Sequence, residues 1–251
     1  MFDECSDTTA RRSPIRTPAQ GRKDRHRLSG LLSGRGSAPP CDQARQPILP
    51  AIIVAAEPAI VNVAAHGLPR FAEPLRIIDC GAFTGVAIHK FLKAGYEIAS
   101  FVAFEPDPAN FAILASRNFP VDRRICLPLG TWSTTRQLSF ASNGSMASHL
   151  SDAGDTTIQC VAIDDILYGE QINLIKMDVE GAEVETLKGM RNIIERQNPH
   201  LLISAYHAPE HLYEIVDLIN SWNLRYKFHL KVHEYNTFGT VIYAFPDDGM
   251  G

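Results

Sequence analysis

The chain has 251 residues, of which 45% are hydrophobic and 21% charged, a composition typical of a globular protein rather than a fibrous or membrane-spanning one. Its net charge of −4 gives no reason to expect nucleic acid or an anionic membrane as a partner. The five cysteines are widely spread and form no C-x-x-C pair, which argues against a disulfide framework or a zinc site and favours a reducing, cytoplasmic location.

The first 50 residues differ from the rest of the chain. They carry a net charge of +4, which leaves −8 for residues 51–251, and prolines, glycines and serines interrupt every short apolar run. Such a segment buries too little surface to offset the entropy cost of ordering, so we predict a disordered tail over residues 1–50 and one domain over residues 51–251. The longest apolar stretch, residues 48–65, contains two prolines and a glutamate and falls short of the roughly 20 apolar residues that a membrane span needs.

From residue 51 onward, strand and helix patterns alternate. Short apolar runs predict strands at 75–80, 98–105, 124–130, 172–178 and 200–206, and apolar residues at helical spacing predict helices at 85–96, 107–118, 182–195 and 209–222. In the last of these helices, Leu212, Ile215, Val216 and Ile219 are expected on one buried face.

Two pairs of further strands complete the pattern. Alternating runs at 137–142 and 156–163 predict a small β-hairpin insertion. The runs at 226–232 and 239–245 are too close for a helical crossover and predict an antiparallel hairpin at the edge of the sheet. The expected fold class is therefore α/β, with a mostly parallel seven-stranded sheet.

The loops after the first two predicted strands carry a binding-site pattern. Ligands in such sheets lie beyond the carboxyl ends of the strands, where Asp79, Gly81 and Gly85 follow one strand and Glu105 follows the next. The glycines let the backbone approach a ligand closely, and the spacing between Gly81 and Glu105 is typical of a carboxylate that binds ribose hydroxyls. The alternative is that Asp79 caps a turn and that Glu105 is a solvated strand end. The occurrence of both acids at the ends of successive strands favours a nucleoside site.

The glycine loop also indicates which nucleoside is bound. A dinucleotide site has the pattern G-x-G-x-x-G, whereas this loop reads Gly-Ala-Phe-Thr-Gly, with Phe83 where phosphates would lie. S-adenosylmethionine has a ribose and an adenine but no phosphate. We therefore expect S-adenosyl-L-methionine as the cofactor and a methyltransferase-like site.

These residues resemble the FkbM-type family of S-adenosylmethionine-dependent O-methyltransferases. The resemblance runs from about Arg76 to Pro246 and rests above all on IKMDVEGAEVETLKG (175–189), with support from IDCGAFTG (78–85) and AFEPDPANFAIL (103–114). It implies a Rossmann-like class I methyltransferase fold. One departure is HLKVH, residues 229–233, which stands where the family usually has an Arg-rich run.

The resemblance also implies roles for individual residues. Asp79, Gly81 and Gly85 would hold the methionine part of the cofactor, Glu105 the ribose hydroxyls, and Asp178 would lie near the transferred methyl group. The cofactor-binding residues expected are Asp79, Gly81, Ala82, Phe83, Gly85, Glu105, Pro106, Asp107, Gly130 and Asp178.

An alcohol acceptor must lose a proton, so a general base is expected at a strand end. Asp178 and His207 are the two candidates for this catalytic role; the alternatives are that Asp178 caps the following helix and that His207 is a packed, hydrogen-bonded residue. Asp178, Glu180 and Glu183 also permit a metal site. Carboxylates are favoured in the first turn of a helix, however, and this explains Glu180 and Glu183 without a metal, so none is predicted.

The resemblance thus implies an O-methyltransferase that acts on a hydroxyl of a sugar or another small polyhydroxylated acceptor, such as a glycan or a secondary metabolite. Two alternatives stay open: a nicotinamide-dependent oxidoreductase on a similar fold, and a catalytically inactive relic that only binds a nucleoside. No nucleic acid and no membrane span are expected.

Overall fold

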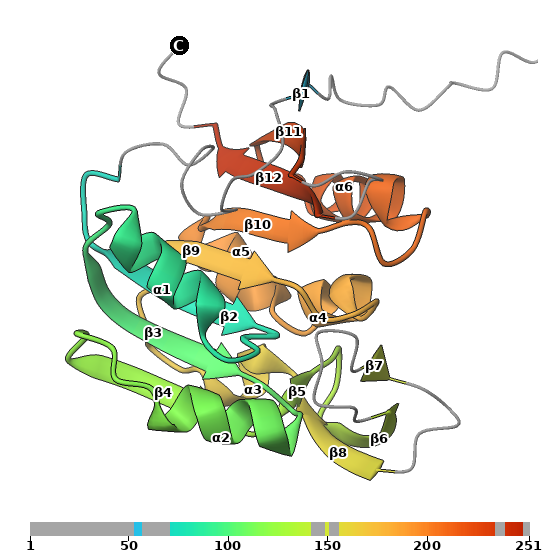
Figure 1. The fold of residues 1–251 in the computed structure, drawn as a ribbon. Helices are drawn as coiled ribbons and strands as arrows, with labels where there is room; N and C mark the ends of the chain where they lie inside the picture. The colour runs from blue at the N-terminus through green and yellow to red at the C-terminus, as the bar shows by residue number, and fades with distance from the viewer. Residues whose placement is uncertain (1–52, 57–70, 142–148, 151–155, 234–238, 248–251) are drawn as a thin grey trace, which may run out of the picture. The chain divides into compact units, whose positions relative to one another are not determined.

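The computed structural model describes residues 53–56, 71–141, 149–150, 156–233 and 239–247, and the tail predicted over residues 1–50 lies outside them. Within the described residues, a large sheet is flanked by helices and a small sheet follows its edge strand (Figure 1).

The large sheet confirms the predicted α/β fold class. Its order is β1-β11-β12-β10-β9-β2-β3-β4. The bounds are β1 Ile53–Ala56, β2 Leu75–Cys80, β3 Ile98–Phe104, β4 Arg123–Leu127, β9 Leu174–Met177, β10 His200–Ser204, β11 Tyr226–Val232 and β12 Thr240–Pro246. The strands β10, β9, β2, β3 and β4 are parallel, and β12 is antiparallel to both of its neighbours, β10 and β11. Beyond the seven predicted strands, β1 pairs with β11, so the closing hairpin is followed by one more parallel strand.

The strand order reverses between β2 and β9. From β2 the chain moves outward through β3 to β4, and it then returns to the other side of β2, where β9 and β10 follow. The carboxyl ends of β2 and β9 therefore lie side by side at the topological switch point, which is where open α/β sheets bind their ligands.

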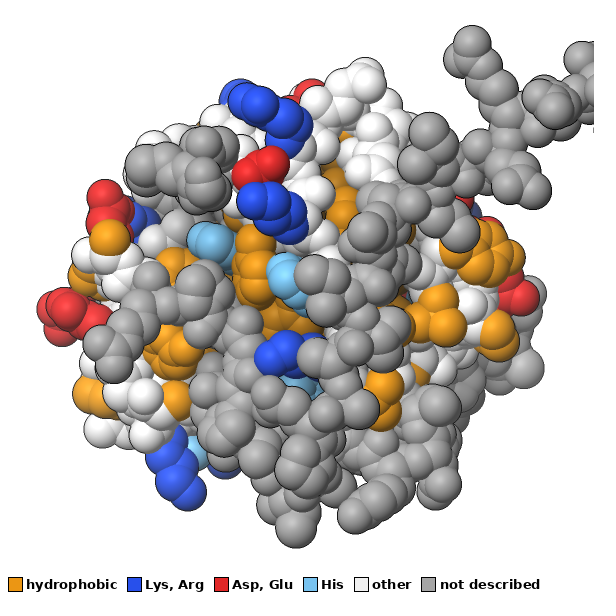
Figure 2. Space-filling view, turned by 90° about the horizontal axis from the view of Figure 1, so that it is seen from above, with side chains coloured by type: hydrophobic (Ala, Val, Ile, Leu, Met, Phe, Trp, Pro, Cys, Tyr) orange, Lys and Arg blue, Asp and Glu red, His pale blue; other side chains and the backbone are white. Residues whose placement is uncertain are grey.

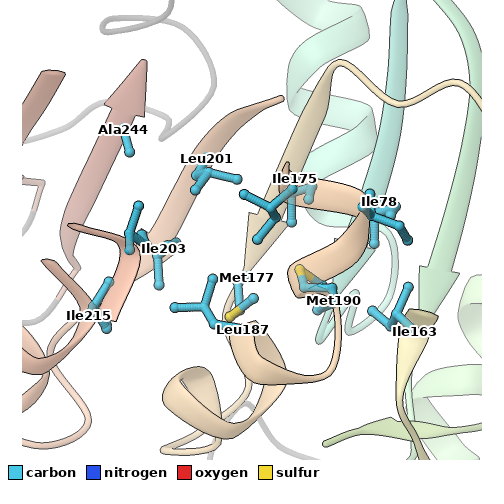
Figure 3. Close-up of a cluster of buried hydrophobic side chains, with 14 of the residues drawn as sticks. Ile78, Ile163, Ile175, Met177, Leu187, Met190, Leu201, Ile203, Ile215 and Ala244 are labelled. Atoms are coloured by element: carbon cyan, nitrogen blue, oxygen red, sulfur yellow. The ribbon is translucent and has the colours of Figure 1, made fainter. Parts of the chain in front are cut away.

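Helices cover the two faces of the large sheet. One face packs against α1 (Val86–Lys93) and α2 (Pro108–Ser116), and the other packs against α3 (Ile163–Ile166), α4 (Glu183–Lys188), α5 (Arg191–Gln197) and α6 (His211–Ser221). Side chains alternate between the faces, so that Ile77 contacts the first group of helices and Ile78 the second. Figure 3 shows the second face, where Ile175, Met177 and Ile203 point toward Leu187 and Ile215.

The helix predicted over residues 182–195 is wrong in one respect, because the structure divides it into α4 and α5. The break falls at Gly189 and Met190. A Cβ atom on Gly189 would lie 2.0 Å from the carbonyl oxygen of Trp132, so the helix end is pressed against the small sheet. The local apolar spacing gives no sign of this long-range contact.

The buried face of α6 also differs from the prediction at one position. Ile215, Val216 and Ile219 are buried as expected, but Leu212 is 40% exposed and His211 is buried in its place. Residues 211, 215 and 219 share one face at four-residue spacing. Because Leu212 is apolar and directly follows His211, the apolar pattern predicted Leu212 on the buried face in place of His211.

The predicted hairpin insertion is a pair of antiparallel strands, β6 (Arg136–Ala141) and β8 (Thr156–Val161). Two-residue strands extend the pair on both sides, giving the order β5-β8-β6-β7, with β5 at Gly130–Thr131 and β7 at His149–Leu150. The strand predicted over 124–130 accordingly ends at Leu127, and Gly130 belongs to the small sheet.

The segment that departs from the family pattern lies in and directly after β11. Figure 2 views the molecule from the side of β11 and β12 and shows hydrophobic side chains with histidines among them in the middle of that face. The ring of His229 packs against Phe245 of β12, with 5.5 Å between the ring centroids. Aromatic packing within the hairpin therefore accommodates this histidine.

None of the helices in the described part of the chain has the length and hydropathy that a membrane span requires.

The two leucines Leu187 and Leu212 give a matched test of the core. Leu187 in α4 is fully buried and Leu212 in α6 is 40% exposed. We expect Leu187→Ala to lower the free energy of unfolding by about 2–5 kcal/mol, because it leaves a cavity. Leu212→Ala should change it by only about 0.5 kcal/mol. Urea unfolding of both variants measures the difference, and equal losses would contradict the assignment of the buried face of α6.

Candidate active site

A cavity of about 320 Å³ opens at the switch point. Its walls come from the loop after β2, from α1, from the end of β9 and from β10 and β12. Four of the predicted site residues line it, namely Gly81, Ala82, Phe83 and Asp178. The cavity has the volume of a small-molecule site and lies where the fold predicts one.

The glycine loop is shaped by close backbone contacts. Gly81 has a φ of +69°, and a Cβ atom there would lie 1.9 Å from the carbonyl oxygen of Asp178. Gly85, with a φ of +79°, is the residue before α1, and its missing side chain makes room for the ring of Phe119. Gly81 therefore lets the ends of β2 and β9 touch, and Gly85 lets α1 start next to α2 and its loop.

Glu105 joins this loop to the end of β3. Its carboxylate accepts hydrogen bonds from the backbone N–H of Phe83 at 2.7 Å and from that of Asp107 at 2.9 Å. Burial raises the pKa of Glu105, and these two N–H groups partly offset the rise. Phe83 is held at a φ of +51°, a conformation that few residues other than glycine adopt. Glu105 is thus not a solvated strand end, and it sets the conformation of the loop.

Asp107 starts α2, as the sequence predicts. Its side chain accepts hydrogen bonds from the N–H groups of Ala109 and Asn110 at 2.9 and 3.0 Å, with Pro108 at the first helical position. Asp107 and Pro106 lie at the end of β3 but do not line the cavity. These two residues lie beside Glu105 and shape the site without forming part of the cavity wall.

Close packing in the small sheet explains why residue 130 is a glycine. A Cβ atom there would lie 2.6 Å from the Sγ atom of Cys160, its partner in the small sheet. Trp132, two residues further along, is partly buried and packs against Ile158 and Cys160. Gly130 does not line the cavity.

A buried ion pair joins β2 to β9 beneath the cavity. The Nζ atom of Lys176 lies 3.1 Å from a carboxylate oxygen of Asp79, and Asp79 is fully buried. The same Nζ atom donates to the carbonyl oxygens of Gly81 at 2.6 Å and Cys80 at 3.4 Å. Burial by itself lowers the pKa of Lys176, but the carboxylates of Asp79 and Asp178 outweigh this and raise it. Lys176 is therefore charged and fixes both strand ends.

Lys176 is a site residue that is not among those predicted from the sequence. It interrupts the apolar run INLIKMD in a strand that is buried on both faces. A lysine is rarely buried without a partner, so a lysine in such a strand indicates a buried ion pair.

The two candidates for the general base, Asp178 and His207, lie close together beyond the ends of β9 and β10. The Nε2 atom of His207 lies 3.6 Å from Asp178 and 3.3 Å from Glu180. Tyr206 donates its hydroxyl proton to the same carboxylate oxygen of Asp178 at 3.0 Å. The helix α4 is preceded by Ala182 and has no side-chain cap, so the alternative of Asp178 as a helix cap is wrong.

Glu183 holds His207 from the other side. One of its oxygens lies 2.8 Å from Nδ1 of His207, and the other lies 3.1 Å from Nδ1 of His211. The N–H of Val179 also donates to Glu183 at 3.0 Å. Burial by itself raises the pKa of Glu183, but the two imidazoles outweigh it and lower the pKa to about 2.

The electrostatics of His207 follow from the same contacts. Burial by itself lowers its pKa, but the carboxylates of Glu180, Glu183 and Asp178 outweigh this and raise the pKa to about 10. The cluster thus places strong negative potential at the imidazole. Glu180, with a φ of +53°, lies before α4, and Glu183, although it begins α4, is fully buried. Glu183 is thus an acid in the first turn of α4, as the sequence predicts, whereas Glu180 lies before the helix and the first-turn explanation does not apply to it.

These features define the Rossmann-like class I methyltransferase fold. The sheet is mostly parallel, with an antiparallel strand next to its last parallel strand, and a glycine loop follows the central strand β2 while an acid follows its neighbour β3. A family model described as the methyltransferase FkbM domain matches residues 79–228, more than half of the sequence. The chain belongs to the FkbM methyltransferase family.

Two individual proteins are similar to parts of the chain. Hexuronic acid methyltransferase AglP of Haloferax volcanii is 34% identical over 112 residues, which cover 40% of this chain and 45% of that protein. The crystal structure of methyltransferase FkbM from Methylobacillus flagellatus KT superposes with a TM-score of 0.60 at 27% identity, covering 72% of this chain and 46% of that one. The chain thus spans less than half the length of each.

The Asp79–Lys176 pair can be tested by stability measurements. We expect Lys176→Met to lower the free energy of unfolding by about 3–5 kcal/mol, because it leaves the carboxylate of Asp79 buried without its counter-charge. The double variant Asp79→Leu/Lys176→Met removes both charges and should recover most of that loss. Urea unfolding of the two variants checks this, and a single variant as stable as the wild type would show that the pair does not hold the strand ends.

Proposed function

We propose that the chain transfers a methyl group from S-adenosylmethionine to a hydroxyl oxygen of a sugar or another small polyhydroxylated acceptor. The observation that carries this proposal is the carboxylate of Glu105, which bridges the glycine loop and the end of β3 beside the cavity at the switch point.

The residues present fit the proposed cofactor. Glu105 uses one acceptor position on each oxygen for Phe83 and Asp107, and a carboxylate has about four, so two stay available for ribose hydroxyls. Gly81 offers backbone without a side chain next to Asp178, where the methionine part would lie. Asp79 lies beneath this loop and is paired with Lys176, so its part in cofactor binding is to hold the loop.

The same geometry disfavours the oxidoreductase alternative. A dinucleotide site needs free backbone N–H groups at the loop for the pyrophosphate. Here the N–H of Phe83 is taken by the carboxylate of Glu105, whose negative charge would also repel a phosphate.

S-adenosylmethionine supplies an already activated methyl group on its sulfonium sulfur. The protein then has to align the acceptor oxygen with that group and to accept the acceptor's proton. We assign the proton to Asp178, which lines the cavity and whose side chain is 25% exposed. His207 does not line the cavity and is packed behind Asp178, so it is a positioning residue rather than the base.

Two observations support a sugar as acceptor. The similar protein of Haloferax volcanii is named a hexuronic acid methyltransferase. The cavity is mostly apolar, with four polar residues, Lys90, Lys176, Asp178 and Ser204, on its wall. Lys176 is committed to Asp79, whereas Lys90 is a cation that suits a sugar carrying a carboxylate.

Cofactor binding can be measured by calorimetric titration with S-adenosylhomocysteine and, separately, with NADH. We expect S-adenosylhomocysteine to bind the wild type and Glu105→Gln to weaken it by roughly 10- to 100-fold, the loss of charge-assisted hydrogen bonds to the ribose. Glu170→Gln, which alters a carboxylate paired with Arg123 at the opposite ends of the strands, should bind like the wild type. Binding of NADH, or of neither ligand, would contradict the proposal.

The role of Asp178 can be measured with labelled methyl transfer to hexuronic acids. We expect Asp178→Asn to lower turnover by about 100- to 10,000-fold, the usual contribution of a general base. The affinity for S-adenosylhomocysteine should change far less, because the ribose contacts are intact. Undiminished turnover would remove Asp178 from the mechanism, and turnover absent from the wild type with bound cofactor would favour the inactive relic.

A further inference from the structure

Three side chains beyond the carboxyl ends of β9 and β10 lie close enough together to bind one metal ion. Asp178, Glu183 and His207 each offer one oxygen or nitrogen atom, and these atoms all lie within 4.8 Å of one another. Ligands of one divalent cation lie about 2.0–2.6 Å from it, so two of them can be separated by at most about 4–5 Å. The three atoms are therefore within reach of a single ion with little movement.

The cluster also holds a buried nitrogen without a hydrogen bond. The side chain of His207 is only 9% exposed, and its Nε2 atom makes no hydrogen bond, although Asp178 and Glu180 lie 3.6 and 3.3 Å away. A buried polar atom is normally satisfied, and one left over beside two carboxylates is a place for a further electrophile. A proton or a metal ion can fill that place.

The balance of charge points to a cation as well. Three carboxylates, Asp178, Glu180 and Glu183, face the two imidazoles of His207 and His211, and the hydroxyl of Tyr206 adds no charge. A histidine binds a metal ion in its neutral form, and with both imidazoles neutral the cluster carries three negative charges, one of them on the fully buried Glu183. Buried carboxylates of this kind are paired or coordinate a metal.

We propose that Asp178, Glu183 and His207 form a binding site for one divalent cation, with Mn²⁺ as the type of ion that suits it. Two carboxylates and one imidazole are a mixed oxygen and nitrogen set, which suits Mn²⁺ or Zn²⁺ better than Ca²⁺. Three protein ligands leave coordination positions open, as in catalytic rather than structural metal sites. The Nδ1 atom of His211 lies 3.1 Å from the second oxygen of Glu183, so His211 can orient this carboxylate as an outer-shell partner.

The part of the ion in catalysis rests on the methyl transfer proposed above. Because Asp178 also lines the cavity, an ion bound to it is adjacent to the acceptor. An ion there would lower the pKa of a coordinated acceptor hydroxyl and fix its position, and the proton would pass to Asp178, which gives only one of its two carboxylate oxygens to the ion. A vicinal diol of a sugar can occupy two open positions at once.

The site is tested by binding of the metal alone. The purified full chain is treated with EDTA, desalted and titrated with MnCl₂, and free Mn²⁺ is followed by electron paramagnetic resonance. We expect one Mn²⁺ per chain in the wild type and a loss of affinity of about 10-fold or more in Asp178→Asn and in Glu183→Gln. Glu185→Gln, two residues along on α4 and paired with Lys188, is the matched control and should bind as the wild type does.

The outcomes separate the two proposals. Thermal unfolding and S-adenosylhomocysteine titration of each variant show whether it is folded, and Asp178→Asn, with its partly exposed side chain, covers the case that Glu183→Gln does not fold. Absence of saturable Mn²⁺ binding, or equal binding by folded Asp178→Asn and wild type, overturns the metal site while cofactor binding stands. Mn²⁺ binding without any binding of S-adenosylhomocysteine supports the metal site and overturns the methyltransferase proposal.

Discussion

The contact between β2 and β9 is the constraint on which the site depends. These two strands are neighbours in the sheet although they are almost one hundred residues apart in sequence, and Lys176 ties them together through Asp79 and the carbonyl oxygens of Cys80 and Gly81. Gly81 then allows the loop after β2 to rest on the backbone of Asp178. The loop proposed to hold the methionine part of the cofactor and the residue proposed to accept the proton are thus fixed to each other by a backbone contact and by the buried side chain of Lys176.

A second layer of the site lies at the end of β10. His207 is held between Glu183 on one side and Asp178 and Glu180 on the other, so the carboxyl ends of β9 and β10 form one connected group of charges. Burying the carboxylate of Glu183 alone would cost free energy, and the imidazoles of His207 and His211 offset this cost. A proton on His207 and a divalent cation both suit this arrangement of negative charges, so the same geometry is compatible with the positioning role of His207 and with the proposed metal site.

Much of this fold follows from local sequence patterns. The parallel strands and their helices have strong apolar periods, and Asp107 with Pro108 marks the start of α2 as the rules of helix capping require. The glycine loop and Glu105 were recognisable because their spacing is set within one strand–helix–strand unit. What the sequence could not show depends on contacts between distant segments: the break at Gly189, the eighth strand β1, the partner of Lys176 and the meeting of Glu183 with His207 and His211. Each of these is decided by tertiary packing, which residue spacing alone does not encode.

The most direct test of the central claim is a crystal structure of the chain with S-adenosylhomocysteine. We expect the ribose hydroxyls within hydrogen-bonding distance of the carboxylate of Glu105 and the sulfur atom next to the contact between Gly81 and Asp178. A ligand bound away from both the glycine loop and Glu105 would contradict the assignment of this switch point as the site of methyl transfer.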